Sequence, residues 1–466
     1  MHLELKINFL CLLLFSMNIF SANAQSFAFD TAKNKVADSL PKDFPIPALK
    51  DIAIGKSVKL TFGGQLREFY QNFHNESWGD IPPAWVDKNG FFWHRIILST
   101  DWQFGKRINL FGELNSALTS GRKGGNRPSV DYNELDLSQL YLQVTLFQNS
   151  KSNFKIKAGR QMYSFGSGRL ISKREPLNNR LSFNGATAIY QNKNFTLISF
   201  IAQPIYNKYY VFDDSVVKSQ TIWGSDLVHS QTGKATKWEL YYYGSSNSNI
   251  QLAGNFGKDI RHTIGVLLTT AMGKWTFETE PVLQFGKFNS NTATAYSLSF
   301  TVKKKYLIEK TRLTPGLSLG VFSGDKNAID HTLNTYNGLY SNQPFGLTAP
   351  LGPANIMGCN PEITIAPGDD WQFRFLSYIL WRNRRGDGLY TPAASPAIQQ
   401  IYPADAVNTR HSKFIGSHYV IAIDYKMTNY LSIGFNGGYF IGGTYLKQTG
   451  KGKDITYLSG TIMLNF

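Results

Sequence analysis

Charged side chains recur at alternate positions along several stretches of this chain, between apolar neighbours. Such alternation puts the charged set on one face of an extended strand and the apolar set on the other. Arginine binds a carboxylate through two parallel hydrogen bonds, so this face would suit an anionic ligand. The alternative is a structural ladder of basic and acidic pairs. The basic set is Lys59, Arg67, Arg95, Lys155, Lys157, Lys303, Arg312, Arg374 and Arg382, and the acidic set is Asp101, Glu113, Glu239, Glu278, Glu280 and Asp424.

Two of these acids have a spacing that glycoside hydrolysis could use. Glu278 and Glu280 point the same way on one strand, with Cα atoms about 6.6 Å apart. We favour the simpler role, in which they oppose basic residues. The one G-x-S-x-G run, 316–320, lies inside a predicted strand and not at the strand-to-helix turn of a nucleophile elbow, and the histidines lack the i, i+4 partner and the acid of a helical zinc site. A serine and a histidine that meet only in the folded protein remain an alternative. We expect that the protein is not an enzyme and that it has no cofactor, metal site or nucleic-acid partner.

The elements that position these groups are segments of about ten residues with alternating apolar and polar side chains. The first begins at Val58, and the last ends at Phe466. Leu135 and Leu137 are out of phase with the strand that follows them, which predicts an irregularity. About 18 strands are predicted, an even number as in single-chain bacterial barrels. They cover 58–67, 92–104, 107–119, 135–146, 154–164, 181–190, 195–203, 236–244, 260–270, 274–286, 295–303, 312–322, 370–382, 417–427, 430–441 and 455–466, with weaker candidates at 206–213 and 247–254.

Composition supports an all-β, transmembrane antiparallel β-barrel. The chain has 14% aromatic residues and 41 glycines. After the N-terminal 24 residues, it has no apolar stretch of the ~20 residues that a spanning helix needs. A secreted all-β domain is the alternative, but no domain break is visible after Val58.

The two ends and two internal stretches define the predicted organisation. Residues 1–24 have the layout of a signal peptide, with Lys6, an apolar core at 9–20 and the small-residue site Ala22-Asn23-Ala24. Residues 25–56 are predicted to be a periplasmic lead-in, and residues 57–466 the barrel of the bacterial outer membrane. The stretches 324–370 and 383–413 show little alternation and would either gate the pore or lie on the surface.

The formal net charge is +16. Because the lipid-facing band of a barrel must be apolar, most of these charges belong in the lumen, loops and turns. A basic lumen would favour anions. Basic loops that bind anionic lipopolysaccharide are the competing explanation.

One part of the sequence resembles a known family. Residues 158–170 contain Gly159-Arg160-Gln161, Tyr163, Gly166 and Arg169-Leu170 and look like the "GRQ…YG…RL" signature of the alginate export family of outer-membrane barrels. Residues 180–185 resemble its "R-x-F-D-G" motif, with Asn184 in place of the usual aspartate. Further matches follow in the expected order at 275–280, 323–325, 353–355, 381–382 and 387–390.

The resemblance implies an 18-stranded barrel that exports an anionic uronic-acid polymer through an electropositive, loop-gated lumen. It adds Arg160 and Arg169 to the candidate lumen residues. Alternation puts Arg160 on the lipid side, where a mid-bilayer arginine costs about 2–4 kcal/mol. A bulge at Gly159 would turn Arg160 inward.

These observations lead to one functional hypothesis and one alternative. The hypothesis is a channel for an anionic, alginate-like polysaccharide or oligosaccharide, surrounded by outer-membrane lipid and lipopolysaccharide, with periplasmic polymer-delivery proteins as further partners. The alternative is a plugged barrel with an adhesion or envelope-structural role. The candidate substrate-binding residues are Lys59, Arg67, Arg95, Arg160, Arg169, Arg374, Arg382, Glu278 and Glu280.

Overall fold

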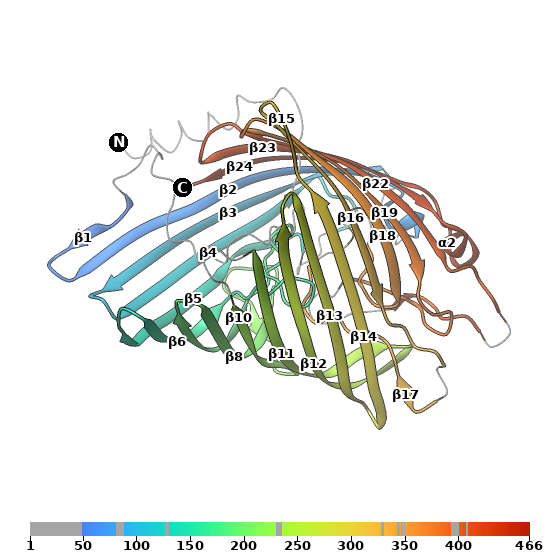
Figure 1. The fold of residues 1–466 in the computed structure, drawn as a ribbon, viewed down its shortest axis with the longest axis horizontal. Helices are drawn as coiled ribbons and strands as arrows, with labels where there is room; N and C mark the ends of the chain where they lie inside the picture. The colour runs from blue at the N-terminus through green and yellow to red at the C-terminus, as the bar shows by residue number, and fades with distance from the viewer. Residues whose placement is uncertain are drawn as a thin grey trace.

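The computed structural model describes residues 49–80, 88–125, 130–229, 235–327, 330–342, 345, 348, 350–392, 400–406 and 409–466. The predicted signal peptide, 1–24, and residues 25–48 of the predicted lead-in lie outside the described residues. Eighteen long antiparallel strands form one closed barrel (Figure 1). The predicted fold class is therefore confirmed.

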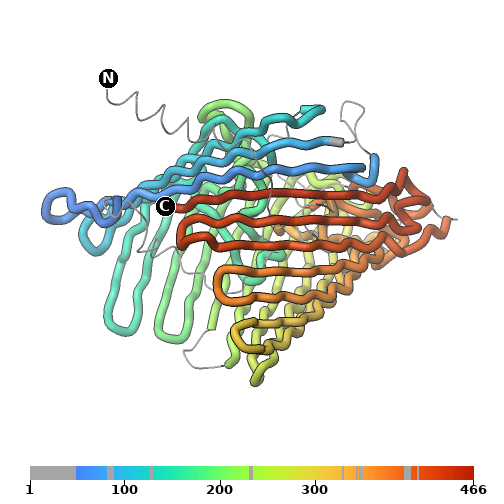
Figure 2. The backbone as a smooth tube through the Cα atoms, turned by 90° about the horizontal axis from the view of Figure 1, so that it is seen from above, coloured from blue at the N-terminus to red at the C-terminus, as the bar shows by residue number. Residues whose placement is uncertain are grey.

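The barrel closes because its first and last strands pair. Residues Gln65–His74 of β2 pair with Thr456–Asn465 of β24, and Figure 2 shows these blue and red strands side by side. Closure leaves no open sheet edge to lipid. The barrel strands are β2 (Val58–His74), β3 (Lys88–Phe104), β4 (Ile108–Ser120), β5 (Asn133–Gln148), β6 (Ser152–Gln161), β7 (Phe183–Asn192), β8 (Phe195–Tyr206), β10 (Gln220–His229), β11 (Thr236–Leu252), β12 (Asn255–Met272), β13 (Trp275–Phe288), β14 (Asn291–Lys304), β16 (Thr311–Phe322), β18 (Ile356–Pro367), β19 (Trp371–Arg382), β22 (Phe414–Lys426), β23 (Leu431–Gly442) and β24 (Ile455–Asn465).

The outer face of the barrel is apolar. On β3, Ile96 is 44% exposed and Leu98 is 51% exposed, whereas Arg95 and Ile97, which alternate with them, are 1% and 4% exposed. The same alternation runs round the ring, and it leaves leucine, isoleucine and phenylalanine side chains exposed on the outside. An exposed apolar band on a closed barrel is the surface that contacts lipid.

The two ends of the barrel differ in the length of their connections. At the end that holds Val58 and Asn465, neighbouring strands join through short turns such as 105–107, 149–151, 273–274 and 368–370. At the other end lie the long connections 162–182, 207–219, 323–355 and 383–413. In outer-membrane barrels the short turns are periplasmic and the long connections extracellular.

The predicted number of strands is correct, but two of the predicted strands are wrong. Residues 206–213 lie mostly in the connection after β8, and residues 247–252 continue β11 rather than starting a new strand. The true strands that the alternation missed are β10 and β18. Because β18 occupies 356–367, the predicted loop 324–370 is shorter, at 323–355.

Proline explains why β18 was missed. Apolar and polar residues alternate along 357–365, but Pro361 lies in the middle of this run and has no N–H to donate, which argues against a strand. The pairing of β18 with β19 accordingly stops after Cys359 and resumes at Glu362. The irregularity predicted near Leu137 is confirmed, because the register between β4 and β5 shifts there.

Short elements decorate the barrel ends. β1 (Ile52–Ile54) pairs with the start of β2, and a six-residue helix, α2 (Thr444–Thr449), lies in the connection between β23 and β24. No helix among the described residues is long and apolar enough to cross a membrane.

Gly159 of β6 is a position where the backbone requires glycine. Its φ is +128°, and a Cβ atom would lie 2.3 Å from the carbonyl oxygen of Leu140. We expect Gly159→Ala to destabilise the refolded barrel by about 2 kcal/mol or more, measured by urea unfolding in detergent. The control is Gly112→Ala, whose Cβ would lie 3.6 Å from the nearest atom, Thr100 Oγ1. Equal unfolding midpoints for the two variants would contradict this expectation.

Candidate functional site

The connection between β6 and β7 crosses the barrel interior, and we call residues 162–182 the crossing segment. On one wall, Arg95 of β3 donates hydrogen bonds to the backbone oxygens of Glu175 and Leu177, both at 3.1 Å. On another wall, Arg169 of the crossing segment lies 2.7 Å from Glu280 of β13. β3 and β13 are nine strands apart in either direction around the ring, so the crossing segment spans the interior.

Arg67 and Arg95, two of the predicted lumen residues, lie together on adjacent strands and hold the crossing segment. Both side chains are 1% exposed. Arg67 donates to the backbone oxygens of Glu175, Pro176 and Leu177 at 3.3, 3.4 and 3.0 Å. These acceptors are neutral, so they leave the positive charge of Arg67 largely uncompensated.

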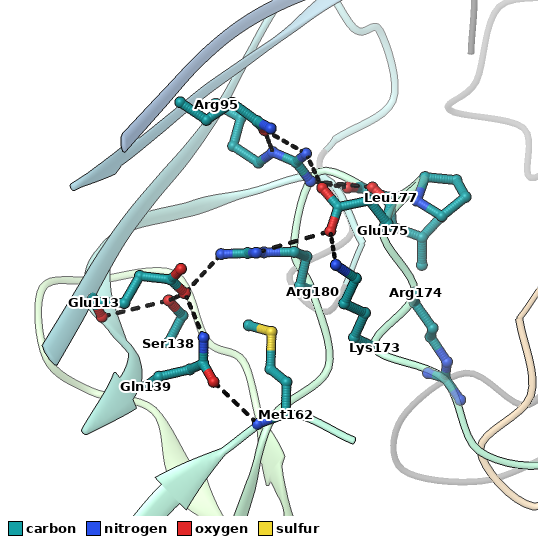
Figure 3. Close-up of polar contacts among 12 residues, drawn as sticks. Arg95, Glu113, Ser138, Gln139, Met162, Lys173, Arg174, Glu175, Leu177 and Arg180 are labelled. Atoms are coloured by element: carbon teal, nitrogen blue, oxygen red, sulfur yellow. Dashed lines mark hydrogen bonds and ion pairs between the residues drawn. The ribbon is translucent and has the colours of Figure 1, made fainter. Parts of the chain in front are cut away.

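One carboxylate of the crossing segment draws three cations together (Figure 3). Glu175 lies 2.5 Å from Arg95, 3.2 Å from Lys173 and 3.7 Å from Arg180. Burial alone would raise the pKa of Glu175, but Arg95, Lys173, Arg180 and Arg67 together hold this pKa well below its ordinary value. Glu175 is therefore ionised throughout the physiological pH range.

The second acid of this group is Glu113 of β4. It accepts hydrogen bonds from Arg180 at 2.7 Å, from Ser138 at 2.5 Å and from Gln139 at 3.3 Å (Figure 3). We call the six charged side chains here the basic cluster, and its four cations outnumber its two carboxylates by two. Its members are Arg67, Arg95, Lys173, Arg180, Glu113 and Glu175.

A second group at the opposite wall is acidic. Arg169 contacts both Glu280, at 2.7 Å, and Glu278, at 3.4 Å, so the structure brings together three predicted site residues. Glu280 also accepts hydrogen bonds from Ser167 at 2.6 Å and from Tyr241 at 3.0 Å. The interior is therefore mixed in charge, with more cations than carboxylates in the basic cluster and more carboxylates than cations around Arg169.

Two predicted basic residues lie elsewhere on the inner wall. Arg374 of β19 pairs with Asp424 of β22 at 2.9 Å, which makes a neutral pair. Arg382 at the end of β19 is fully buried against Asp405, at 2.9 Å, and over the ring of Tyr445, at 3.8 Å. Arg382 thus anchors the connection 383–413 and is not available to a ligand.

Lys59 and Arg160 lie away from the basic cluster, although Lys59 shares the inner face of β2 with Arg67, as its position along the strand predicts. Lys59 is exposed near the periplasmic end of β2, where its register partners are Ala53 and Gln103. Arg160 keeps its register with Leu140, which is 44% exposed on the outer face, so the bulge expected at Gly159 does not occur in the pairing.

The charge of Arg160 is balanced locally. Its guanidinium lies 3.1 Å from Asp136 at the extracellular end of β5. Carboxylate oxygens of Asp136, Asp213 and Asp214 lie within 4.8 Å of one another, a spacing that could hold a metal ion. Burial raises the pKa of Asp214 to about 7, and Arg160 supplies a positive charge, so the group has little need of a cation.

A second connection also enters the barrel, and we call residues 323–355 the inner loop. Tyr340 donates its N–H to the oxygen of Leu170 at 2.8 Å and accepts from Ser172 at 3.1 Å, so the inner loop pairs with the crossing segment. The inner loop also contacts β12, where Arg261 donates to the oxygen of Thr335 at 2.8 Å and Asn337 donates to Asp259 at 3.0 Å, and β13, where Gln284 donates to the oxygen of Asn337 at 2.8 Å.

Asp387, in the connection 383–413, fixes the inner loop to its surroundings. Its buried carboxylate accepts hydrogen bonds from the N–H groups of Asp325 and Gly388, both at 2.8 Å, from Thr335 at 2.6 Å and from Tyr390 at 2.5 Å. The two connections that the sequence marked as candidate gates therefore form one packed unit. Their gating role remains a prediction.

Asp325 makes the packing of the inner loop sensitive to pH. Burial raises the pKa of Asp325 to about 6. Because the raised pKa belongs to the packed loop, protonation favours packing, and this contribution is lost as the pH rises through about 6. The measurement is the rate of amide hydrogen exchange in 330–342 of the wild type, divided by the rate in Asp325→Asn at the same pH. We expect this ratio of exchange rates to rise between pH 5 and pH 7. A constant ratio would contradict this expectation.

The sequence analysis missed Lys173 and Glu175 and assigned Arg180 only to a motif. They lie between two strands in a stretch without alternation, so strand periodicity carries no information about where they point. The available signal was length, because the connection from 162 to 182 is longer than a plain turn.

The fold and the interior groups can now be compared with known proteins. Residues 58–458 match the family described as alginate export. The chain belongs to the alginate export family. The resemblance predicted from its motifs is therefore confirmed. No curated protein matches this family member in sequence.

Solved outer-membrane proteins share the fold of this alginate export family member. The BenF-like porin of Pseudomonas fluorescens Pf-5 is 11% identical with a TM-score of 0.55, covering 87% of this chain and 98% of its own. OccAB1 of Acinetobacter baumannii is 8% identical, also with a TM-score of 0.55, covering 87% and 96%. OccK2 of Pseudomonas aeruginosa, solved with glucuronate, is 11% identical with a TM-score of 0.53, covering 87% and 98%. The family and the porin-like fold indicate a bacterial outer-membrane channel rather than an enzyme.

Proposed function

We propose that this protein passes an anionic saccharide that carries uronate groups, as a polymer or as oligomers, across the outer membrane. The observation that carries the proposal is the basic cluster, in which four cations and two carboxylates lie where the crossing segment meets β2 and β3. An excess of positive charge inside a pore favours the entry of anions. The proposal therefore places recognition at this wall.

The chemistry of the basic cluster suits a carboxylate better than a small inorganic anion. A guanidinium presents a planar fork of donors that matches the two oxygens of a carboxylate. The glucuronate found with OccK2 supports a uronate as the ligand class, since that protein has a similar fold.

The acidic group on the opposite wall fits the same proposal. Glu278 and Glu280 face the interior near Arg169 and would repel a polyanion from that side. Transport requires sites that bind weakly enough to release the solute. A basic wall opposed by an acidic one meets this requirement, because it orients the saccharide without holding it tightly.

The partners follow from the same proposal. The substrate is an anionic polysaccharide or oligosaccharide, delivered by periplasmic proteins at the short-turn end of the barrel. Outer-membrane lipid would contact the apolar band, and lipopolysaccharide would meet the extracellular connections.

A plugged barrel with an adhesion or envelope-structural role is the second candidate, because the crossing segment and the inner loop both occupy the interior. Efflux from liposomes separates the two. We expect fluorescently labelled trigalacturonate to leave liposomes that contain the protein faster than labelled maltotriose, a neutral control of similar size. Retention of both saccharides would overturn the channel and favour the plug, and equal efflux would overturn anion recognition.

A further inference from the structure

The side chain of Glu175 is surrounded in the way that a bound uronate would be. Its two carboxylate oxygens face Arg95 at 2.5 Å, Lys173 at 3.2 Å and Arg180 at 3.7 Å (Figure 3). Arg95 comes from the barrel wall, and Lys173 and Arg180 come from either side of Glu175 in the crossing segment. Cations from separate places thus converge on one carboxylate.

The two arginines are oriented by groups other than the Glu175 carboxylate. Gln65 Oε1 accepts from Arg95 Nε at 2.9 Å and from Arg95 Nη2 at 2.6 Å, and the oxygen of Leu177 accepts from Arg95 Nη1 at 3.1 Å. Glu113 holds Arg180 at 2.7 Å. The arrangement of donors would therefore persist if the Glu175 carboxylate left it, as a preorganised ligand site does.

Glu175 and Lys173 are the partly exposed members of the group, and the Oε2 atom of Glu175 is itself buried. The side chains of Glu175 and Lys173 are 37% and 44% exposed, whereas those of Arg95 and Arg180 are 1% and 9% exposed. The arginines thus form the fixed floor of the arrangement. Glu175 and Lys173 are the side chains of this group that a solute can reach.

We propose that Glu175 occupies a carboxylate-binding site for the uronate groups of the transported saccharide and acts there as an internal competitor. A uronate would displace the Glu175 carboxylate from Arg95 and Arg180, and Glu175 would return when the sugar moves on. This inference rests on the proposed function, and it names the atoms that recognise the substrate. Competition keeps binding weak without removing the recognition groups, which is the condition for passage.

The test is block of single-channel current by digalacturonate in planar bilayers, with the full-length mature protein and Glu175→Gln. The amide keeps the size of the side chain and removes the competing charge, while the backbone oxygen of Glu175 still binds Arg67 and Arg95. We expect the half-blocking concentration to fall about fivefold in Glu175→Gln, as removal of one competing charge at a half-exposed site allows. Maltose is the neutral control, and its effect should not change.

A second variant tests whether the effect of Glu175→Gln comes from the lost charge or from a changed conformation of the crossing segment. Arg180→Gln removes a floor cation and should raise the half-blocking concentration of digalacturonate, in the opposite direction to Glu175→Gln. Block of the wild type with an unchanged or raised value in Glu175→Gln would overturn the competitor role alone. If digalacturonate blocks neither the wild type nor Glu175→Gln, the proposed function fails, and this inference fails with it.

Discussion

Replacement of Arg67 and Arg95 by glutamine in one variant is expected to raise single-channel conductance several-fold and to lower the preference for anions. These two side chains bind the backbone oxygens of residues 175–177, which join the crossing segment to the wall of β2 and β3. Hydrogen bonds from a charged donor contribute about 1.5–3 kcal/mol each, so their joint loss should free this end of the crossing segment. Planar-bilayer recordings of refolded protein measure both effects.

The matched control for this variant is Arg312→Gln. Arg312 is 54% exposed at the periplasmic end, where it pairs with Asp369, so its loss should leave conductance and selectivity as in the wild type. An Arg67 and Arg95 double variant that conducts like Arg312→Gln, with its barrel folded, would contradict the role given to the crossing segment.

Asp387→Ala is expected to have the second-largest effect, because it releases the inner loop. The carboxylate of Asp387 accepts four hydrogen bonds, two of them from Asp325 and Thr335 of the inner loop. Loss of a buried charged acceptor leaves these donors without partners, at a cost of about 1–3 kcal/mol for each buried group. We expect trypsin to cleave after Lys326 at least tenfold faster in Asp387→Ala, and current through the barrel to become noisier.

Asp369→Ala is the control for Asp387→Ala. Its carboxylate is 88% exposed at the opposite end of the barrel, and it should not change cleavage after Lys326. Equal cleavage rates in wild type and Asp387→Ala would show that the inner loop is held by other contacts.

Most of the fold could be predicted because one physical rule governs every spanning strand. Lipid on one side and the interior on the other impose a period of two, and this period identified segments such as 58–67 and 455–466. The rule fails where the pattern is broken. Pro361 argued against a strand at β18, and the polar run 245–249 that continues β11 past Gly244 made residues 247–254 look like a separate strand.

The candidate site was predictable only in part. Alternation correctly put Arg67 and Arg95 on the inner face, because facing follows from position along a strand. It could not show that Glu175 and Arg180 would join them, since connections have no period and their course depends on three-dimensional packing. For Arg160, alternation was the better guide. The family motif suggested an inward side chain, but the strand register keeps Arg160 on the face of Leu140.

The central claim is that anions pass the basic cluster, and the most direct test is the zero-current potential of the reconstituted protein across a tenfold gradient of potassium chloride. The account predicts an anion-selective potential that moves toward zero in Arg95→Gln and remains in Arg312→Gln. A silent or cation-selective barrel would contradict it.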